Sequence, residues 1–397
     1  MASTNDSSTT DTNNPFPTGD VAWILSATCI IWIMTPGWFI WGYSLTFSRT
    51  GGPFIGDLRH AFFRNLDWNS GPNNMSRKIP EFVYAIFESN FAVIASALII
   101  GGAAERVRLL PTIIFIFIWS TLVYDIIASW CWSANGWFTI LGGLDFAGGI
   151  PVHISSGAAA LAFCFVVKKR KKIGRPHNFP NIVLGTVLLW FGWFGFNGAS
   201  AAAANKRAIL ACIVTNIAAS FSGLTWMFID FFKWNNFEWN NFKWNNVKCN
   251  KRLSAISFCS GAISGLVAIT PASGYVTAYS AAIIGIASGI ICKLASLMKE
   301  AVVYDDFMDV FAIHGIGGFV GNFLTGIFAD KDIVLLSGDH INGGAINGNP
   351  FQILIQLSGS CVAMVYSFVV TLAILFIIDR ILGLELRFDG DTDEVEM

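Results

Sequence analysis

Two histidines of this 397-residue chain lie inside long apolar segments, where ionisable side chains are costly. His153 stands in "PVHISSG" and His314 in "FAIHGIGG", whereas His60, His177 and His340 fall in loops. Imidazole both donates and accepts hydrogen bonds and can hold a proton near neutral pH. One such histidine could simply hydrogen-bond a neighbouring helix. Two of them on non-adjacent segments favour a shared functional lining.

An aspartate precedes each of these histidines. Asp145 lies eight residues before His153, and Asp309 lies five residues before His314. A carboxylate at the start of a helix accepts hydrogen bonds from free backbone N–H groups and favours the helix dipole. We expect this capping role for Asp309. For Asp145, capping and the bracing of an outer cation site are both open, because a negative group there would attract cations.

The composition is that of a polytopic membrane protein. The chain is 54% hydrophobic and 13% charged, and it contains 35 Phe and 15 Trp. A soluble domain of this length would carry more surface charge. The formal net charge of -1 gives no reason to expect nucleic-acid binding. The eight cysteines lack C-x-x-C spacing, so we expect no disulfide framework and no metal site.

We expect neither enzymatic activity with catalytic residues nor a cofactor. The main cofactor alternative is a haem protein of the two-histidine kind. That arrangement needs histidine pairs recurring on the same helices, which this sequence lacks.

Because about twenty apolar residues cross a bilayer, the sequence predicts ten spans. They are 22–47, 81–101, 111–131, 148–167, 181–203, 208–232, 255–271, 276–297, 307–328 and 353–379. The domain layout that follows is a disordered polar tail over 1–20, a transmembrane domain over 21–384 and a short acidic tail over 385–397. Within the domain, the repeat "KWNNFEWNNFKWNNVK" predicts a low-complexity loop insertion over 233–250.

Basic residues predict the orientation in the membrane. The loop over 168–175 carries six Lys or Arg residues, while loops on the alternate side carry almost none. The positive-inside rule therefore places this loop and the C-terminus in the cytosol. Residues 49–78 depart from the rule, with five basic residues on the expected outer side.

Glycines and aromatics surround the histidine motifs. The small residues of "HGIGGFVGNFLTG" and "FGWFGFNGASAAAAN" let helix backbones approach closely. A desolvated aromatic face attracts a cation by up to about 2 kcal/mol. Most of the Phe, Tyr and Trp residues are expected to face lipid or the membrane interface, so only those beside the histidine motifs are candidates for such a site.

Several long motifs carry a family resemblance. "FAVIASALIIGGAAERVR", "NGWFTILGGLDFAGGIPVHISSG", "WFGWFGFNGASA" and "DDFMDVFAIHGIGGFVGNFLTGIFA" resemble the ammonium transporters of the Amt/Mep/Rh superfamily, in particular the fungal Mep type. The resemblance runs from about residue 20 to about residue 390. It implies eleven transmembrane helices in an inverted five-plus-five repeat. It also implies a trimer, of identical copies or mixed with paralogues, with one pore per subunit in the plasma membrane.

The resemblance also implies roles for individual residues. These are twin pore histidines at His153 and His314, a phenylalanine gate at Phe91 and Phe196, ammonium recruitment at Trp132, Ser200 and Phe87, and support of that site by Asp145, Trp193 and Glu88. Ammonium would bind outside and give up its proton, and ammonia would then cross the apolar pore. The alternative function is a non-transporting ammonium sensor or a regulatory, degenerate subunit of a mixed trimer.

The chain departs from the family pattern at several points. After "MTPG", about thirty residues, a helical hairpin, are absent, so that one span over 22–47 stands where the family has two. Glu88 occupies a position where the family usually has glutamine, and "YDIIASW" lacks the usual proline. The acidic C-terminus is short in a region that couples subunits in relatives.

Overall fold

The computed structural model describes residues 36–67, 79–103, 106–169, 178–232, 253–302 and 304–387. Over these ranges the protein is helical, and its only strand-like pairing is an isolated antiparallel bridge between Val107 and Arg387. A helix satisfies its backbone N–H and C=O groups internally, which a segment crossing lipid requires. The predicted tail over 1–20, the insertion over 233–250 and residues 388–397 lie outside the described ranges.

The elements before residue 81 are short, and all the long helices follow it. The first half contains η1 (Trp38–Gly42), α2 (Tyr43–Phe47), η2 (Ala61–Phe63), α3 (Glu81–Ala103), α4 (Leu109–Trp119), η3 (Ser120–Tyr124), α5 (Asp125–Trp132), α6 (Trp137–Ile140), η4 (Gly149–Ile154) and α7 (Ser155–Val167). The second half contains α8 (Phe179–Ala199), α9 (Lys206–Phe232), α10 (Ala255–Ile269), α11 (Ala278–Val302), η5 (Phe311–Ile316), α12 (Gly317–Phe328), α13 (Lys331–Leu335), η6 (Ala345–Asn347), α14 (Phe351–Phe376) and η7 (Ile377–Ile381).

Among the described residues, eight helical segments are long and apolar enough to cross a bilayer. They are Glu81–Ala103, Leu109–Ile140, Gly149–Val167, Phe179–Ala199, Lys206–Phe232, Ala278–Lys299, Phe311–Phe328 and Phe351–Ile381. Each matches one of the predicted spans, which confirms an all-α polytopic membrane fold. The predicted span 255–271 is the shorter apolar helix α10. The predicted span 22–47 is described only over 36–47, where the chain is helical.

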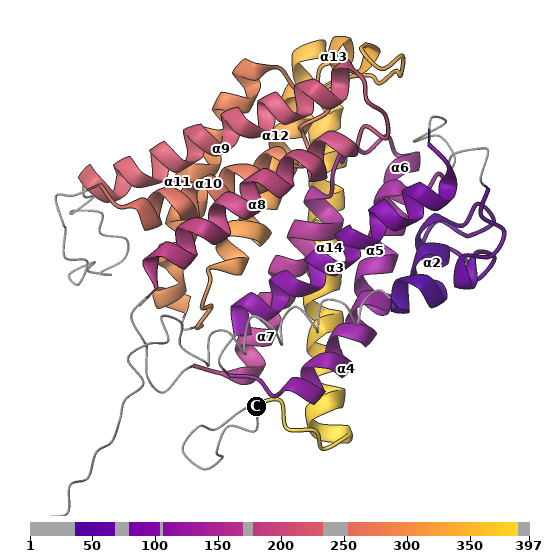
Figure 1. Cartoon of the computed structure of the whole chain (residues 1–397), viewed down its shortest axis with the longest axis vertical. Coiled ribbons are helices and arrows are strands. Elements are labelled where there is room, and N and C mark those ends of the chain that lie inside the picture. Colours follow the sequence, from indigo (N-terminus) through magenta and orange to yellow (C-terminus); the bar gives the residue numbers. More distant parts are fainter. Residues whose placement is uncertain are drawn as a thin grey trace, which may run out of the picture.

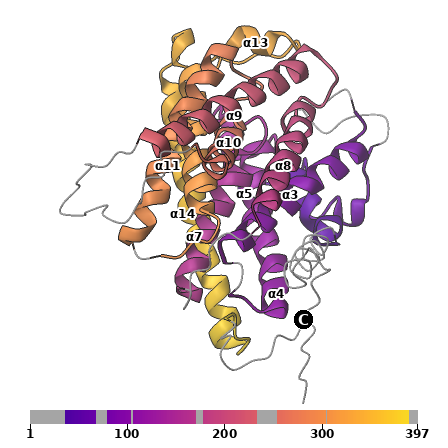
Figure 2. The ribbon, with the colours of Figure 1, turned by 60° about the vertical axis from the view of Figure 1, so that its left-hand side comes forward.

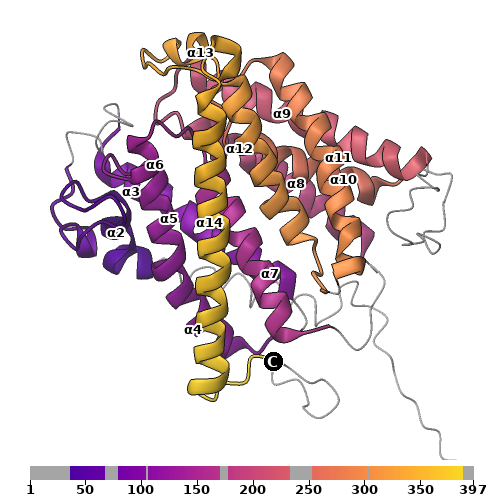
Figure 3. The same ribbon diagram turned by 180° about the vertical axis from the view of Figure 1, so that it is seen from behind.

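Two groups of helices flank a central pair. Helices α8 to α11 lie on one side, α2, α4, α5 and α6 lie on the other, and α7 and α14 run between them (Figure 1). Seen from behind, α14 extends along most of the height of the molecule (Figure 3). The end that carries α13, at the top of Figures 1 and 2, is called the α13 end below. The opposite end of α14, which carries η7, is called the η7 end.

The two histidine segments are built alike and run past one another in opposite directions. Each begins with a six-residue π-helical stretch, η4 or η5, and continues as an α-helix, α7 or α12. Helix α7 packs against η5, and α12 packs against η4. The head of each segment therefore meets the body of the other, which is the local form of the expected inverted repeat.

Buried glycines permit this crossing. A Cβ added at Gly157 would lie 2.2 Å from the backbone nitrogen of Gly315, and one added at Gly318 would lie 2.9 Å from the carbonyl oxygen of Gly149. Real side chains do not fit at such distances, so glycine is required for the two backbones to touch.

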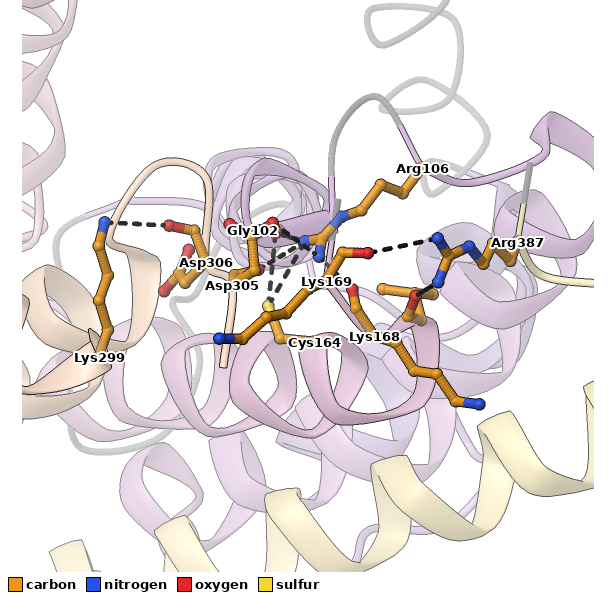
Figure 4. Close-up of polar contacts among 10 residues, drawn as sticks. Gly102, Arg106, Cys164, Lys168, Lys169, Lys299, Asp305, Asp306 and Arg387 are labelled. Atoms are coloured by element: carbon orange, nitrogen blue, oxygen red, sulfur yellow. Dashed lines mark hydrogen bonds and ion pairs between the residues drawn. The ribbon is translucent and has the colours of Figure 1, made fainter. Parts of the chain in front are cut away.

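Arg106 joins three chain segments at the η7 end (Figure 4). Its buried guanidinium donates hydrogen bonds to the carbonyl oxygens of Gly102, Lys168 and Asp305 over 2.6 to 2.7 Å. Arg387 adds a second clasp by donating to the carbonyl oxygens of Val167 at 3.0 Å and Lys169 at 3.3 Å. The ends of α3 and α7, the segment before η5 and the segment after η7 are thereby held together.

Candidate functional site

The crossing of the two histidine segments brings His153 and His314 together. Their Nδ1 atoms lie 3.2 Å apart, and their ring centroids lie 5.2 Å apart. Their exposed fractions are 0% and 7%. In a hydrogen bond between two Nδ1 atoms, one carries the hydrogen and the other offers its lone pair. When both rings are neutral, one Nε2 atom therefore accepts hydrogen bonds and the other donates them.

The Nε2 atom of His153 has no hydrogen-bond partner among the described residues. Buried polar atoms are nearly always paired, so an unpaired ring nitrogen calls for a specific explanation. A ring contact fixes the imidazole instead, because His153 stacks on Trp193 with centroids 5.3 Å apart and planes 19° apart. Trp193 is itself held by a 2.9 Å hydrogen bond from its indole N–H to the hydroxyl of Thr270.

A line of aromatic rings leads to the histidine pair. Phe91 on α3 and Phe196 on α8 stack face to face, with centroids 4.2 Å apart and planes 22° apart. Phe196 lies 6.2 Å from the ring of His153, and Phe87 packs edge-on against Phe91 at 4.9 Å. The structure thus brings the predicted gate residues together, directly beside the histidines.

Trp132 stands next to this line of rings. Its ring meets Phe91 edge to face, with centroids 5.7 Å apart, and its indole N–H donates to the backbone carbonyl of Asp145 at 3.0 Å. The rings of Trp132 and Phe91 and the main chain of Asp145 thus form one connected unit at the start of η4.

Asp145 caps η4. Its carboxylate accepts hydrogen bonds from the backbone N–H groups of Gly148, Gly149 and Ile150 over 2.7 to 2.8 Å. Burial raises the pKa of this carboxyl group to about 6, and the three N–H groups oppose that rise. Since both carboxylate oxygens accept from the main chain, the geometry is that of a helix cap. The backbone carbonyl of Asp145, in addition, holds the indole of Trp132.

The expected capping role of Asp309 is wrong, and Asp306 takes it. The Asp306 carboxylate accepts a 2.8 Å hydrogen bond from the backbone N–H of Phe311 at the head of η5. Asp309 instead has a left-handed backbone (φ 55°) and pairs with Lys299 at 2.6 Å. Asp306 lies eight residues before His314, as Asp145 does before His153, and this equal spacing was the signal available in the sequence. Burial raises the pKa of Asp306 to about 6 as well.

Ser200 and Glu88 lie at the margins of this group. The hydroxyl of Ser200 donates to the carbonyl of Phe196 at 2.8 Å, and no described hydrogen bond or ring contact joins it to Trp132. Glu88 is buried one turn before Phe91, and its Oε2 atom has no partner among the described residues. Within the described ranges no three His, Cys, Asp or Glu side chains are grouped to hold a metal ion.

The sequence matches a known protein family along almost its whole length. The model of the Ammonium Transporter Family matches residues 18–397. The chain belongs to this family. Ammonium transporter 1 of Schizosaccharomyces pombe is 43% identical over an alignment of 427 residues that covers 98% of this chain and 82% of that protein. Ammonium transporter MEP2 of Saccharomyces cerevisiae is 38% identical, and the alignment covers 98% of this chain and 83% of that protein.

A solved structure agrees with the fold of this family member. The crystal structure of Candida albicans Mep2 matches with a TM-score of 0.81 at 39% identity, covering 96% of this chain and 88% of that one.

Proposed function

We propose that this protein transports ammonium across a lipid bilayer. Support comes from its family, from its multi-pass helical fold and above all from one observation. The stacked rings of Phe91 and Phe196 lead onto a buried histidine pair whose His153 Nε2 atom is unpartnered. A small solute that hydrogen-bonds would find a polar partner there, beside the apolar rings.

The proposed path begins with ammonium at Trp132 and Phe91. Aromatic faces attract a desolvated cation, and the lone pairs of Ser200 and the ring of Phe87 complete the recruitment site. Asp145 acts indirectly, because its carboxylate holds the head of η4 and its backbone carbonyl holds the indole of Trp132. Trp193 and Glu88 are assigned supporting roles.

Before passage, ammonium gives up its proton to water on the outer side, and neutral ammonia enters. A bare ammonium ion would lose its hydration in an apolar passage, whereas neutral ammonia loses far less. The centroids of Phe91 and Phe196 are 4.2 Å apart, so the two rings must part to admit the solute. Beyond them ammonia, a donor and an acceptor, is matched by one accepting and one donating Nε2 atom of His153 and His314.

The proposal places the protein in the plasma membrane as a multi-pass homotrimer, or as a mixed trimer with paralogues. The basic loop over 168–175 supports a cytosolic η7 end and a cytosolic C-terminus. The α13 end, with Trp132 and Asp145, then faces outward. The division into a tail over 1–20, a transmembrane domain over 21–384 with the insertion over 233–250, and a tail over 385–397 belongs to the same proposal.

Growth of yeast lacking its own ammonium transporters tests this function. Cells expressing the wild-type chain are expected to grow when ammonium is the limiting nitrogen source, and cells expressing His153→Ala at the same surface amount are not. Wild-type protein at the surface without growth would contradict transport and favour the non-transporting sensor or regulatory subunit.

A further inference from the structure

A glutamine of α14 is fully buried between the two halves of the site. Gln356 has an exposed fraction of 0%, inside the apolar segment Phe351–Ile381. A carboxamide in such surroundings destabilises a protein unless its two donors and its acceptor oxygen are all used. In this structure all of them are used.

The side-chain amide of Gln356 forms hydrogen bonds with both the backbone N–H and the backbone carbonyl of one residue, Leu144. The Oε1 atom of Gln356 accepts from the backbone N–H of Leu144 at 2.9 Å, and its Nε2 atom donates to the Leu144 carbonyl at 2.5 Å. Leu144 is followed directly by Asp145, which caps η4 and holds the indole of Trp132. Two bonds to one peptide residue fix both its position and its orientation, which a single bond would not do.

The second donor of Gln356 reaches the other histidine segment. Nε2 also donates to the Oδ1 atom of Asn322 on α12 at 2.6 Å. The Nδ2 atom of Asn322 donates to the hydroxyl of Ser360 at 2.7 Å and to the Gln356 carbonyl at 3.0 Å. Helix α12 continues directly from η5, which carries His314. One side chain of α14 therefore links the loop before η4 to the helix after η5.

Close packing holds this link in place. A Cβ added at Gly326 would lie 2.9 Å from the Cα atom of Ile353 and 3.1 Å from the Cγ atom of Gln356, so α12 and α14 touch there. The fourth hydrogen bond of the carboxamide comes from Gln352, one turn away, at 3.2 Å. With Gln352 and Asn322 bonded to it in addition to Leu144, the side-chain amide of Gln356 has both donors and its acceptor oxygen occupied.

We propose that Gln356 is a positioning residue for the ammonium site. Its two hydrogen bonds to Leu144 determine the position of Asp145 relative to Phe91. Through Asp145 they also determine the position of Trp132. This inference rests on the proposed function, because it concerns the recruitment of ammonium there. It predicts that loss of the clamp weakens recruitment more than it slows the passage that follows.

Methylammonium uptake by the full chain in transporter-deficient yeast tests the proposal. Gln356→Met keeps the side-chain length and removes all four bonds, and Gln356→Glu in its ionised form keeps an acceptor for the Leu144 N–H but no donor. Each variant is expected to raise the KM for methylammonium about tenfold, since displaced recognition groups lose binding steeply. The maximal rate per transporter at the surface is expected to stay within about threefold of wild type.

Two further variants serve as controls. Asn322→Ala removes one of the four bonds of the carboxamide but neither bond to Leu144, and it is expected to raise KM less than the two Gln356 variants do. Ser358→Ala is the matched control, because Ser358 lies two residues along α14 and its hydroxyl bonds only the Ile355 carbonyl of its own helix, at 2.7 Å. Both keep the geometry of the Asp145 loop.

The possible results separate the inference from the function on which it rests. Absence of uptake by wild type and Ser358→Ala would refute the proposed function. Uptake by both controls, with unchanged KM in the two Gln356 variants, would overturn the positioning role alone. So would a fall in maximal rate at constant KM, or failure of both Gln356 variants to reach the surface, because these results describe a residue needed only for folding.

Discussion

His153 is buried in an apolar helix and satisfied on only one side. Its Nδ1 atom meets His314, its ring face meets Trp193, and its Nε2 atom is left without a partner among the described residues. A histidine kept only for helix packing would be expected to use both nitrogens. Under the proposed function, a solute in the shared lining would be the partner of this nitrogen.

Trp132 provides a prediction for the recruitment of ammonium. Replacing it by leucine removes the aromatic face beside Phe91 and the hydrogen bond to the Asp145 carbonyl. The KM for methylammonium is expected to rise about tenfold, within the range of a desolvated cation–π contact. Uptake kinetics measure this, with Trp137→Phe as a control that keeps an aromatic ring. An unchanged KM in Trp132→Leu would remove this residue from the recruitment site.

Asp145 provides a prediction for the dependence of stability on pH. Burial raises the pKa of its carboxyl group from 3.8 to about 6 in the folded protein. Ionisation therefore costs more in the folded than in the unfolded chain, and the stability due to this group falls as the pH rises from about 4 to about 6. The excess Tm of wild type over Asp145→Asn is expected to shrink across that interval.

Thermal unfolding of the purified protein in detergent, from about pH 4.5 to about pH 7, measures this difference. Asp332→Asn, at an exposed residue of α13, is the control and is expected to track wild type. A gap between wild type and Asp145→Asn that widens with rising pH would contradict the assigned pKa.

The sequence indicated the candidate residues of the site, but it did not show which other residues hydrogen-bond them. The histidines, the gate phenylalanines and Asp145 stand in motifs, whereas Thr270 and Gln356 are ordinary polar residues of apolar helices. Only the fold brings them to Trp193 and Leu144. Asp306 was missed because Asp309 is nearer to His314, and a left-handed backbone at Asp309, invisible in the sequence, turns that carboxylate toward Lys299.

At the scale of elements, the crossing of α7 with η5 determines the distance between the histidines. Gly157→Ala would place a methyl group 2.2 Å from the backbone nitrogen of Gly315. We expect this change to separate the two segments, to cost about 2 kcal/mol of stability or more and to abolish transport. Thermal unfolding and uptake on the same preparation measure both effects.

Gly192→Ala is the matched control for this crossing. Gly192 lies inside α8, where an added Cβ would meet nothing within 4 Å. Its Tm is expected to be equal to or slightly above that of wild type, because alanine favours a helix more than glycine does. Equal tolerance of alanine at Gly157 and Gly192 would contradict the close crossing.

Span positions followed from hydropathy because length and apolar character determine which segments cross a bilayer. The departures from regular α-helix inside the spans could not be predicted from hydropathy. The six-residue π-helical stretches η4 and η5 depend on capping by Asp145 and Asp306 and on contact with the opposite segment. These are tertiary causes, and hydropathy does not report them.

At the scale of the whole molecule, buried Arg106 holds three chain segments together at the η7 end (Figure 4). Arg106→Met would remove the guanidinium hydrogen bonds to the carbonyl oxygens of Gly102, Lys168 and Asp305. We expect a loss of about 3 kcal/mol of stability. Arg380→Met is the control, because the Arg380 side chain is 73% exposed in its ion pair with Asp379, and it is expected to cost less than about 1 kcal/mol. Similar Tm values for both variants would contradict the clasp.

The overall architecture was predictable because the family motifs cover nearly the whole chain. Orientation in the membrane depends on the lipid bilayer, and subunit number depends on partner chains. The form of the first span depends on residues before Pro36, which lie outside the described ranges.

The central claim is that ammonia passes the histidine pair of this chain. The most direct measurement is methylammonium uptake into proteoliposomes that contain only the purified protein, comparing wild type with His153→Ala at equal protein content and equal oligomeric state. The account predicts saturable uptake by wild type and its loss or altered kinetics in His153→Ala. Identical uptake kinetics in the two preparations, or no uptake by correctly assembled wild type, would contradict it.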